Sequence, residues 1–447
     1  MNPIWEIVPY TRGKGLEVNS ESRVFPHFMR ADVDCVKSQS LDFVLARDAK
    51  RIEPQWWRVL KFGGYLVVIG EDVSAELDHY DEVRRETTGN ELFQVYRRKQ
   101  SGGRVVAHDV IPQKSVAVVR YGAYGDAIQA SSVLPYLKSE GYHVTFYGHP
   151  TSYDVLKHDP HIDRWVVQDP NQVPNEALLQ FWEYESAKYE RWINLSESVE
   201  GTLLATSDRA PFYWPKAARH KHMNRNYLEM VHEIADVPMP PKAKFYATDE
   251  EKAWARKQME KAGVAIVYSM SGSSIHKTWP YMDALIARVM TDSKTAKVVL
   301  VGAESDAWLQ EPWANEERVW KMAGKWSIRQ AMAFAEEADL VIGPETGLLN
   351  ACGLADVPKV CLLSHSTAEN LTKHWINAKV IAPPDTVACY PCHRLVMQWS
   401  HCNRDEATGV ALCAAKIDVD TVWLAVQDVF REKRERQSGN GQLLHAA

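Results

Sequence analysis

Two glycine-bearing segments far apart in the chain have residue types that suit phosphate binding. Arg120–Asp126 (RYGAYGD) follows the apolar run Val116–Val119, and Gly343–Asn350 (GPETGLLN) follows the apolar run Leu340–Ile342. Each pattern predicts a strand, a tight turn and the start of a helix. The free N–H groups and positive dipole end of a helix N-terminus favour phosphate, and glycine lets a ligand approach the backbone closely. The sequence therefore predicts two nucleotide-fold domains that face one cleft.

The elements that must position these turns alternate between strand and helix patterns. Such alternation predicts a parallel sheet with helices on both faces, which binds ligands at the carboxyl ends of its strands. A first set of expected strands is Val116–Val119, His143–Tyr147, Arg164–Val167 and Arg191–Leu195; a second is Ala265–Ser269, Lys297–Val301, Leu340–Ile342 and Lys359–Leu363. We expect an α/β fold with two doubly wound Rossmann-like domains and a small N-terminal α/β module. No internal sequence repeat is evident.

Changes in composition divide the chain into segments. The expected segments are an N-terminal module in residues 1–100, a polar linker in 101–113, a first Rossmann-like domain in 114–242, a second in 243–430, and a disordered tail in 431–447. The linker carries a Gly-Gly pair, and a proline-rich stretch ends the first Rossmann-like domain. The tail is charged and then rich in Gly, Ser and Gln.

Length and composition limit the class of protein. A chain of 447 residues, of which 45% are hydrophobic and 25% charged, is long enough for two or three globular domains. No apolar run reaches the roughly 18 residues of a transmembrane helix, and Met1–Gly15 lacks a signal-peptide pattern, so we expect a cytoplasmic protein. The net charge of -6 argues against broad non-specific binding of nucleic acid. Seven cysteines in such a chain do not suggest a secreted disulfide scaffold.

The N-terminal module resembles the class I methyltransferase fold. Trp56–Leu66 (WWRVLKFGGYL) is similar to that family's turn between a helix and a strand. The family's cofactor loop, an acidic residue followed by Gly-x-Gly, corresponds here to Glu17–Glu21 (EVNSE), which has no glycine to let S-adenosylmethionine approach. A working methyltransferase does not fit this loop. We expect a degenerate module that packs or docks a partner, and residual cofactor binding is the alternative.

The order and spacing of motifs from about Ser115 to Val429 resemble the GT-B glycosyltransferases. Within that group they resemble glycosyltransferase family 9, the ADP-heptose heptosyltransferases. The motifs that carry the resemblance are Val118–Ala127, His158–Asp163, Ile193–Leu195, Lys277–Pro280 (KTWP), Val301–Glu304, Ala323–Lys325, Thr346–Leu349, Val357–Pro358 and Cys389–Cys392 (CYPC). The resemblance implies inverting transfer of a sugar, such as heptose from ADP-heptose, to a hydroxyl of a lipopolysaccharide, another glycan, a protein or a modified nucleic acid. It implies no cofactor for catalysis.

The resemblance places Asp126 where the acceptor hydroxyl loses its proton. A carboxylate there can act as general base, which contributes roughly 10²–10⁴-fold to the rate. Gly122, Tyr124 and Gly125 would then line the acceptor side of the turn. The alternative is that Asp126 only caps the helix that follows it.

The resemblance places the donor in the second half of the chain. The diphosphate of this nucleotide sugar gains negative charge in the transition state. Preorganised hydrogen-bond donors and cations that face this charge usually make the largest catalytic contribution. Lys277 is the expected cation, with a solvated lysine as the alternative, and Glu304 would accept the ribose hydroxyls unless it is a simple surface acid. The remaining donor-binding residues implied are Ser271, Gly272, Ser273, Glu345, Thr346, Gly347, Leu348 and Asn350.

Two residues of the second turn depart from the family pattern. The family has Asp-Thr-Gly followed three residues later by His, whereas this chain has Glu345 and then Asn350. Glutamate places its carboxylate one methylene further out, and asparagine cannot bring positive charge to a phosphate. Either the donor differs from ADP-heptose or transfer is slow, and an inactive nucleotide-sugar or glycan binding module is the competing hypothesis.

A cysteine cluster lies near the C-terminus. Cys389, Cys392, Cys402 and Cys413 are spaced C-x₂-C-x₉-C-x₁₀-C, and the first pair has the form of a metal knuckle. The cluster resembles the four-cysteine iron site of autotransporter heptosyltransferases. A structural Zn or Fe, free thiols and disulfides all remain open.

Other cysteines, histidines and aromatic residues suggest weaker hypotheses. Buried packing is expected for Cys352 and Cys361. Each of His365, His374, His393 and His401 is expected to be a surface or hydrogen-bonded side chain. The aromatic and basic segment Tyr213–Tyr227 either faces an anionic acceptor or is a solvated helix face.

Overall fold

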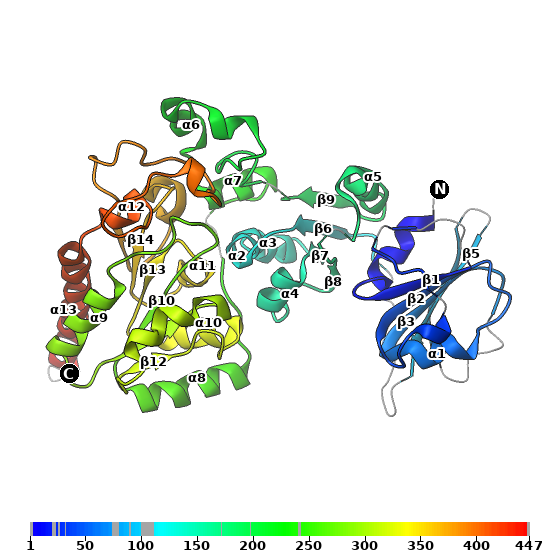
Figure 1. Ribbon diagram of the computed structural model, residues 1–447, viewed down its shortest axis with the longest axis horizontal. Coiled ribbons are helices and arrows are strands. Elements are labelled where there is room, and N and C mark those ends of the chain that lie inside the picture. Colours follow the sequence, from blue (N-terminus) through cyan, green and yellow to red (C-terminus); the bar gives the residue numbers. More distant parts are fainter. Residues whose placement is uncertain are drawn as a thin grey trace. The chain divides into compact units, whose positions relative to one another are not determined.

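The computed structural model describes residues 3–19, 24–25, 27–31, 33–73, 80–88, 91–99, 111–170, 172–196, 198–239 and 243–444 (Figure 1). The chain divides into two compact units, both discontinuous in sequence. Unit 1 comprises Met1–Val119, Gly141–Pro150 and Asp163–Ile193, and unit 2 comprises Arg120–Glu140, Thr151–Ile162 and Asn194–Ala447. Most of the predicted linker, residues 101–110, lies outside the described residues.

Unit 1 contains the N-terminal module, a five-stranded sheet of order β1-β2-β3-β5-β4. Strands β1 to β3 are parallel, and β5 and β4 are antiparallel to their neighbours. The strands are β1 (Gly15–Val18), β2 (Leu41–Arg47), β3 (Leu60–Gly70), β4 (Tyr80–Thr88) and β5 (Glu91–Arg98), with the helices η1 (Pro3–Tyr10), η2 (Val33–Cys35) and α1 (Pro54–Val59). The small N-terminal α/β module expected from the sequence thus contains a mixed sheet and short helices. The likeness to methyltransferases stays a prediction.

A second sheet, of order β8-β7-β6-β9, lies mainly in unit 1. Its strands are β6 (Ser115–Arg120), β7 (His143–Gly148), β8 (Arg164–Val167) and β9 (Arg191–Asn194). Helix α5 (Asn175–Ser186) lies between β8 and β9 in the chain. Each strand matches a predicted apolar run. Within unit 1, the buried Glu6 of η1 is paired with Lys188 and with Arg84 of β4.

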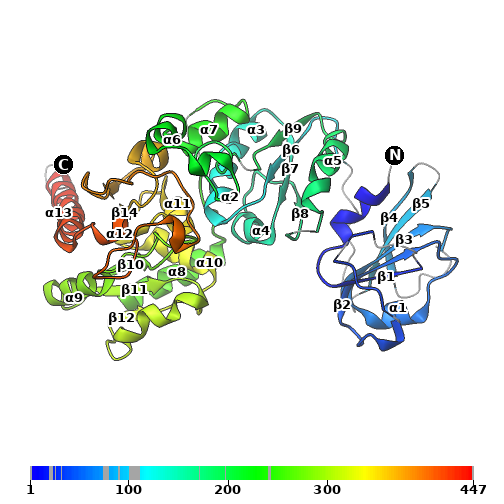
Figure 2. The same cartoon turned by 45° about the horizontal axis from the view of Figure 1, so that its top comes forward.

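Unit 2 is built on a six-stranded parallel sheet of order β12-β11-β10-β13-β14-β15. The strands are β10 (Ala265–Ser269), β11 (Lys297–Val301), β12 (Val319–Lys321), β13 (Leu340–Pro344), β14 (Lys359–Leu362) and β15 (Ala378–Ile381). Helices α9 (Met282–Asp292) and α13 (Val419–Leu444) pack together beside the sheet, and α8 (Asp249–Ala262), α10 (Ile328–Glu337) and α11 (Gly347–Cys352) form a second group (Figures 1 and 2). The mixed α/β fold with parallel sheets is confirmed.

The remaining helices of unit 2 come from all three of its segments. They are α2 (Tyr124–Ser131), α3 (Leu134–Ser139), α4 (Pro150–Leu156), α6 (Lys216–Met223), α7 (Tyr227–Ile234), α12 (Leu412–Ala415) and the short η4 (Ala210–Tyr213), η5 (Glu304–Trp313), η6 (Ala368–Thr372) and η7 (Trp399–His401). Unit 2 thus contains α2, whose glycine turn the sequence assigned to the first Rossmann-like domain, together with the whole of the second.

The tail that the sequence predicted to be disordered is helical through Leu444, as part of α13. The stretch Arg431–Gln437 (REKRERQ) consists of strong helix formers, so helical propensity outweighs the charge that suggested disorder. Lys379 pairs with Glu432, and Asp339 pairs with Lys433, which fixes this turn of the helix to the sheet. Among the described residues, no helix is both long and apolar enough to cross a membrane.

Candidate active site

The two glycine turns pack against each other within unit 2. A Cβ built on Gly125 would lie 2.8 Å from Asn350 Nδ2, and a Cβ built on Gly347 would lie 2.8 Å from Tyr124 Cβ. Real Cβ atoms do not approach other heavy atoms so closely, so the crossing of helices α2 and α11 requires glycine at 347, where Tyr124 Cβ cannot move aside, and favours it at 125, where the end of the Asn350 side chain would have to shift. The structure therefore brings the two sequence-predicted turns together, and each glycine makes room for the opposite helix.

Asp126 lies in the first turn of α2 and uses both carboxylate oxygens. Oδ2 accepts the N–H of Ala123 at 2.8 Å, and Oδ1 lies 3.0 Å from Arg120 Nη2. The Arg120 guanidinium is 1% exposed and also donates to both carboxylate oxygens of Glu200 at 3.0 Å. Burial alone would lower the pKa of Arg120, but the two carboxylates raise it above its usual value. Asp126 thus has the capping contact of the alternative hypothesis, and an ion pair fixes its carboxylate, which is 23% exposed.

Asn350 joins the two helices. Its Oδ1 accepts a hydrogen bond from Gln129 Nε2 at 3.1 Å, and its Nδ2 donates to the Thr346 carbonyl at 3.0 Å. Thr346 is the N-cap of α11, where its hydroxyl accepts the N–H of Leu349 at 3.4 Å and lies 3.1 Å from the Ser269 hydroxyl. The asparagine amide and the threonine hydroxyl, both predicted to bind the donor, are engaged in contacts within the protein. Leu348 is buried.

A second turn of unit 2 repeats the local structure around Asp126. Residues 302–306 have the sequence Gly-Ala-Glu-Ser-Asp, which matches Gly-Ala-Tyr-Gly-Asp at 122–126 in three of five positions. Asp306 Oδ2 accepts the N–H of Ala303 at 2.9 Å, and its Oδ1 accepts the Ser271 hydroxyl at 2.7 Å. Glu304, predicted to bind the ribose, lies exposed at the start of η5. The Gly-Ala-x-x-Asp signature of this repeat is visible in the chain, but at five residues it is too short to stand out as an internal repeat.

Lys277 lies beside the predicted phosphate-binding turn Ser271–Ser273. A Cβ built on Gly272 would lie 2.7 Å from Lys277 Cδ, so the stem of the lysine crosses the glycine, and the Gly272 N–H donates to the Lys277 carbonyl at 3.1 Å. Ser273 is exposed. The ammonium makes no hydrogen bond or ion pair within the described part of the chain, while its charge lowers the pKa of nearby Glu345. Lys277 is thus an unpaired cation close to the second glycine turn.

Glu345 is buried and bonded to the loop that follows β14. Its Oε1 accepts the N–H of Ser364 at 2.6 Å and that of Ser366 at 3.4 Å, and its Oε2 contacts His365 Nδ1. Burial would raise the pKa of Glu345, but His365, Lys277 and the Ser364 amide more than offset it and hold this pKa well below its usual value.

Four histidines extend from Glu345 through the interior. The rings of His276 and His365 are 5.1 Å apart, and His393 Nε2 lies 3.1 Å from His220 Nδ1. Burial is the largest cause that lowers the pKa of His276 and of His365, and it lowers that of His393 to about 3. The sequence analysis placed His365 and His393 in loops without recognising that they gather around Glu345. No spacing signal relates them, because they come from separate loops.

The four cysteines of the cluster lie near one another. Burial is the largest cause that raises the pKa of Cys392 to about 12 and of Cys402 to about 11, with neighbouring cysteines as a further cause, and Cys413 shows the same direction. Within the described residues, however, no three or more His, Cys, Asp or Glu side chains form a group that could hold a metal ion. The metal at Cys389, Cys392, Cys402 and Cys413 is therefore not confirmed.

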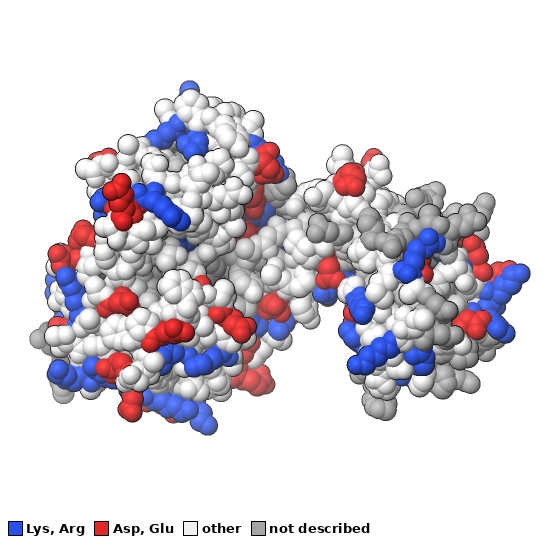
Figure 3. Space-filling view, viewed as in Figure 1, with Lys and Arg blue, Asp and Glu red and all other residues white. Residues whose placement is uncertain are grey.

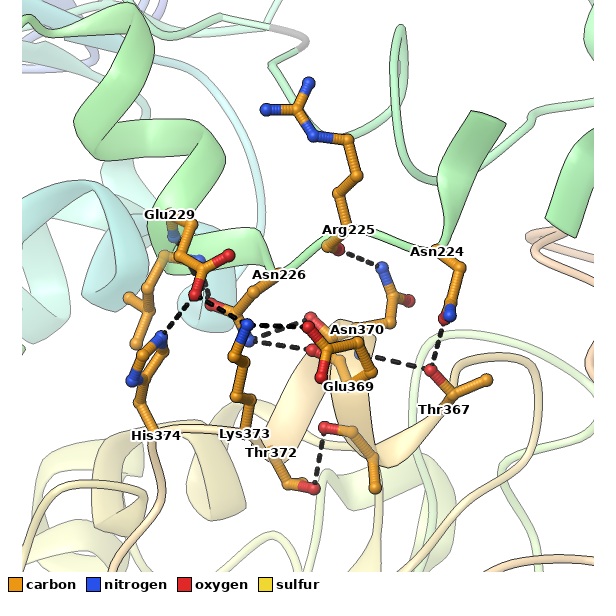
Figure 4. Close-up of polar contacts among 12 residues, drawn as sticks. Asn224, Arg225, Asn226, Glu229, Thr367, Glu369, Asn370, Thr372, Lys373 and His374 are labelled. Atoms are coloured by element: carbon orange, nitrogen blue, oxygen red, sulfur yellow. Dashed lines mark hydrogen bonds and ion pairs between the residues drawn. The ribbon is translucent and has the colours of Figure 1, made fainter. Parts of the chain in front are cut away.

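The aromatic and basic segment Tyr213–Tyr227 forms α6 and the start of α7. Tyr213 is 62% exposed, which both a solvated surface and an acceptor-facing surface would show. At the junction of the two helices, the buried Asn226 caps α7 and donates to the carbonyls of Glu369 and Asn370. Asn370, also buried, donates in return to the carbonyls of Met223 and Arg225 (Figure 4). This reciprocal asparagine pair fixes the junction to η6.

Charged side chains on the face of the molecule in Figure 3 are of both signs and interspersed. In the polar group of Figure 4, Lys373 pairs with Glu229 and Glu369, and His374 Nε2 lies 2.9 Å from Glu229. His374 is thus a partnered side chain, as the sequence predicted.

The sequence matches a family known for sugar transfer. Residues 188–397 match the profile of glycosyltransferase family 9 (heptosyltransferase). A search of curated proteins finds no sequence that matches the chain. The family match covers the second glycine turn, Lys277 and the CYPC motif, and with the structural matches it supports a glycosyltransferase.

Solved structures share the fold. A family 9 glycosyl transferase from Veillonella parvula has a TM-score of 0.54 at 16% identity, covering 72% of this chain and 98% of the other. The ADP-heptose lps heptosyltransferase II of E. coli has a TM-score of 0.50 at 15% identity, covering 72% and 99%. The iron-containing glycosyltransferase TibC from enterotoxigenic E. coli has a TM-score of 0.47 at 11% identity, covering 76% and 83%, which is too weak to carry an inference about a metal here.

Proposed function

We propose that this protein is an inverting glycosyltransferase that transfers a sugar from a nucleotide-activated donor to a hydroxyl group. The observation that carries the proposal is the packing of the two glycine turns, which brings Asp126 and the Thr346–Gly347 turn into one unit with the unpaired cation Lys277. A base and a cation for a leaving diphosphate are the two groups that metal-independent transfer requires. The match of residues 188–397 to glycosyltransferase family 9 supports the same conclusion.

In the proposed reaction the acceptor oxygen attacks the anomeric carbon while the bond from that carbon to the diphosphate breaks. The hydroxyl proton passes to Asp126, whose carboxylate Arg120 and the Ala123 N–H hold in place. The negative charge that grows on the diphosphate faces Lys277 and the backbone of Ser271–Ser273 and Gly347. Thr346 and Asn350 act on this turn through the protein contacts described above, and Glu304 remains available for the ribose hydroxyls.

We propose ADP-heptose or a similar nucleotide sugar as the donor. The support is the family match and the resemblance of the motifs, together with the shared fold of an ADP-heptose lps heptosyltransferase. The acceptor is a lipopolysaccharide, another glycan, a protein or a modified nucleic acid. The exposed Tyr213 and the basic helix α6 are the surface proposed to meet it.

The proposal is tested by calorimetry with ADP-, UDP-, GDP- and dTDP-sugars, followed by transfer assays with the donor that binds. Lys277→Ala should weaken nucleotide binding by about 10- to 100-fold, since charge-assisted bonds contribute about 1.5–3 kcal/mol. Lys257→Ala, which changes an exposed lysine of α8 outside the motifs named above, is the matched control. If no nucleotide sugar binds to the wild-type protein, the proposed function is wrong.

A second candidate function is an inactive nucleotide-sugar or glycan binding module. It is favoured by the commitment of Glu345 and Asn350 to contacts within the protein. Such a module would bind a donor without turning it over, and neither hydrolysis nor transfer would be detected with any acceptor. Turnover that Asp126→Asn abolishes would exclude it.

The metal site at the four cysteines and the domain boundaries are proposed from the sequence alone. Metal analysis of the purified protein beside Cys389→Ser tests the first, and a stoichiometric Zn or Fe that the variant loses would support it. Limited proteolysis tests the second, with cleavage expected first in residues 101–113 and near 240.

A further inference from the structure

We infer that Glu345 is a positioning residue of the donor site: its carboxylate ties together the turns at the ends of neighbouring strands and does not contact the donor sugar. The inference rests on the proposed function, since it describes the site in which the nucleotide sugar would bind. It differs from the direct donor contact that the sequence resemblance implied for this position.

The position of Glu345 in the sheet supports this role. Strands β10, β13 and β14 are parallel neighbours, so the turns that follow them meet at one edge, where α/β sheets bind ligands. Glu345 directly follows β13, the central strand of the three. From there its carboxylate reaches the loop after β14, and the ring of His365 in that loop lies 5.1 Å from the ring of His276, which follows β10, at an angle of 34°. Glu345 thus bonds directly to the loop after β14 and is linked to the turn after β10 through His365.

The contacts of the carboxylate leave no room for a sugar. Oε1 accepts two backbone N–H groups and Oε2 faces His365, and the side chain as a whole is 3% exposed. His365 is likewise 3% exposed. A hydroxyl group of a donor sugar would have to displace these charge-assisted contacts, which are about twice as strong as those between neutral groups.

The extra methylene of glutamate has a structural reason here. Pro344 pairs with Leu362 across β13 and β14, so Ser364 lies beyond the residue directly opposite Glu345. An aspartate, shorter by about 1.5 Å, would not reach the Ser364 and Ser366 N–H groups from this backbone. The departure from the family's aspartate therefore creates the link to the loop.

The loop is also held on its other side. The Tyr390 hydroxyl donates to the Ser366 carbonyl at 2.9 Å, and the His393 N–H donates to the His365 carbonyl at 3.0 Å. Residues 364–366 thus connect the segment that carries the cysteines to the second glycine turn. Because Glu345 immediately precedes the N-cap of α11, a change in its contacts moves the backbone N–H groups proposed to face the diphosphate.

The test compares Glu345→Ala, Glu345→Asp and Glu345→Gln in the full-length protein, with Glu311→Gln as the control at an exposed glutamate. ADP binding is measured by calorimetry and transfer by kcat and KM. Because ADP lacks the sugar that is transferred, weaker ADP binding reports a displaced turn and not a lost contact to that sugar. Hydrogen exchange at the Ser364 and Ser366 amides reports the loop without any ligand.

Glu345→Ala and Glu345→Asp should both weaken ADP binding by about tenfold or more and speed exchange at the two amides. Glu345→Gln should rescue both properties to within about threefold of the wild type, because its amide oxygen accepts the same N–H groups and a neutral His365 can present a lone pair at Nδ1. Protection of the two amides in Glu345→Asp equal to that of the wild type would overturn the inference. If Glu345→Ala binds ADP as the wild type does but loses transfer, Glu345 contacts the transferred sugar, and this result would also overturn the inference. If the wild type binds no nucleotide, the proposed function fails, while the exchange data still decide the contacts of Glu345.

Discussion

Asp126 and Asp306 have the same place in two separate turns of unit 2. Each is the last residue of a Gly-Ala-x-x-Asp segment and accepts the N–H of the alanine three residues earlier, at 2.8 and 2.9 Å. Their second oxygens differ, since Asp126 pairs with a buried arginine and Asp306 accepts a serine hydroxyl. The shared contact is a helix cap, and whatever Asp126 does in addition must come from its charge.

The comparison of Asp126→Asn with Asp126→Ala separates the cap from the base. Asparagine can still accept the Ala123 N–H, so it should recover about 1 kcal/mol of the stability that alanine loses. It cannot take a proton from an acceptor, so transfer should fall by at least about 10²-fold in both variants. Denaturant unfolding and initial rates measure the two effects. Transfer by Asp126→Asn at the wild-type rate would show that the cap is the only role.

Gly347→Ala should destabilise the protein. The added methyl group would meet Tyr124 Cβ at 2.8 Å, and overpacking of this kind costs about 1–3 kcal/mol. Ser305→Ala is the control. Ser305 is exposed, and it has in the 302–306 turn the position that Gly125 has in the 122–126 turn. Its effect should stay within about 0.5 kcal/mol. Equal unfolding midpoints for Gly347→Ala and the wild type would contradict the close crossing of α2 and α11.

Arg120→Met should cost about 2–4 kcal/mol of stability. The change leaves the Asp126 and Glu200 carboxylates without their shared cation, and breaking a buried ion pair costs about 3–5 kcal/mol before allowance for the partial exposure of the two acids. Arg225→Met, which breaks an exposed pair with Glu233, should change stability by less than about 1 kcal/mol. Urea unfolding of both variants measures the difference, and similar losses would argue against the buried network.

The buried histidines should make the protein less stable in mild acid. The pKa values of His276, His365 and His393 are lowered in the folded state, so below about pH 6.5 the unfolded chain binds protons that the folded chain does not. Each such histidine costs roughly 1.4 kcal/mol per pH unit between its unfolded and its folded pKa. Glu345, whose pKa is also lowered, adds to the loss only below its unfolded value near 4.5. The unfolding midpoint should therefore fall steadily between pH 7 and 5.

His393→Asn checks the origin of this slope. The residue has a positive φ of 50°, which asparagine tolerates, and its ring faces His220 on one side, with Arg219, His365 and Glu345 as further charged or titratable neighbours. The variant should show a shallower fall in stability between pH 7 and 5. His222→Asn, at an exposed histidine, should leave the slope unchanged. A slope in His393→Asn as steep as that of the wild type would exclude His393 as a cause.

The strands of the fold could be predicted from the sequence because most of them are short runs of buried, apolar residues. Strands β10 and β11 begin and end where the apolar runs do. The runs did not reveal β12 or β15, which are three and four residues long and half-buried in most positions. Edge strands of this kind are held by pairing with a neighbour more than by their own pattern.

The candidate site could be predicted only in part. The glycine turns and Lys277 follow from local composition, and the structure brings them together. The roles of Asn350 and Glu345 depend on a helix crossing and on the register of two strands, which no local pattern encodes. The 302–306 repeat was readable in the sequence and was overlooked because it is only five residues long.

The crossing of α2 and α11 also limits how this protein can be recombined with relatives. A side chain at Gly125 would meet Asn350, and one at Gly347 would meet Tyr124, so a larger residue at either glycine needs a compensating change on the opposite helix. A chimera that takes the first turn from one parent and the second from another would bring together surfaces that were never selected to fit. In a working chimera, these positions should therefore all come from the same parent.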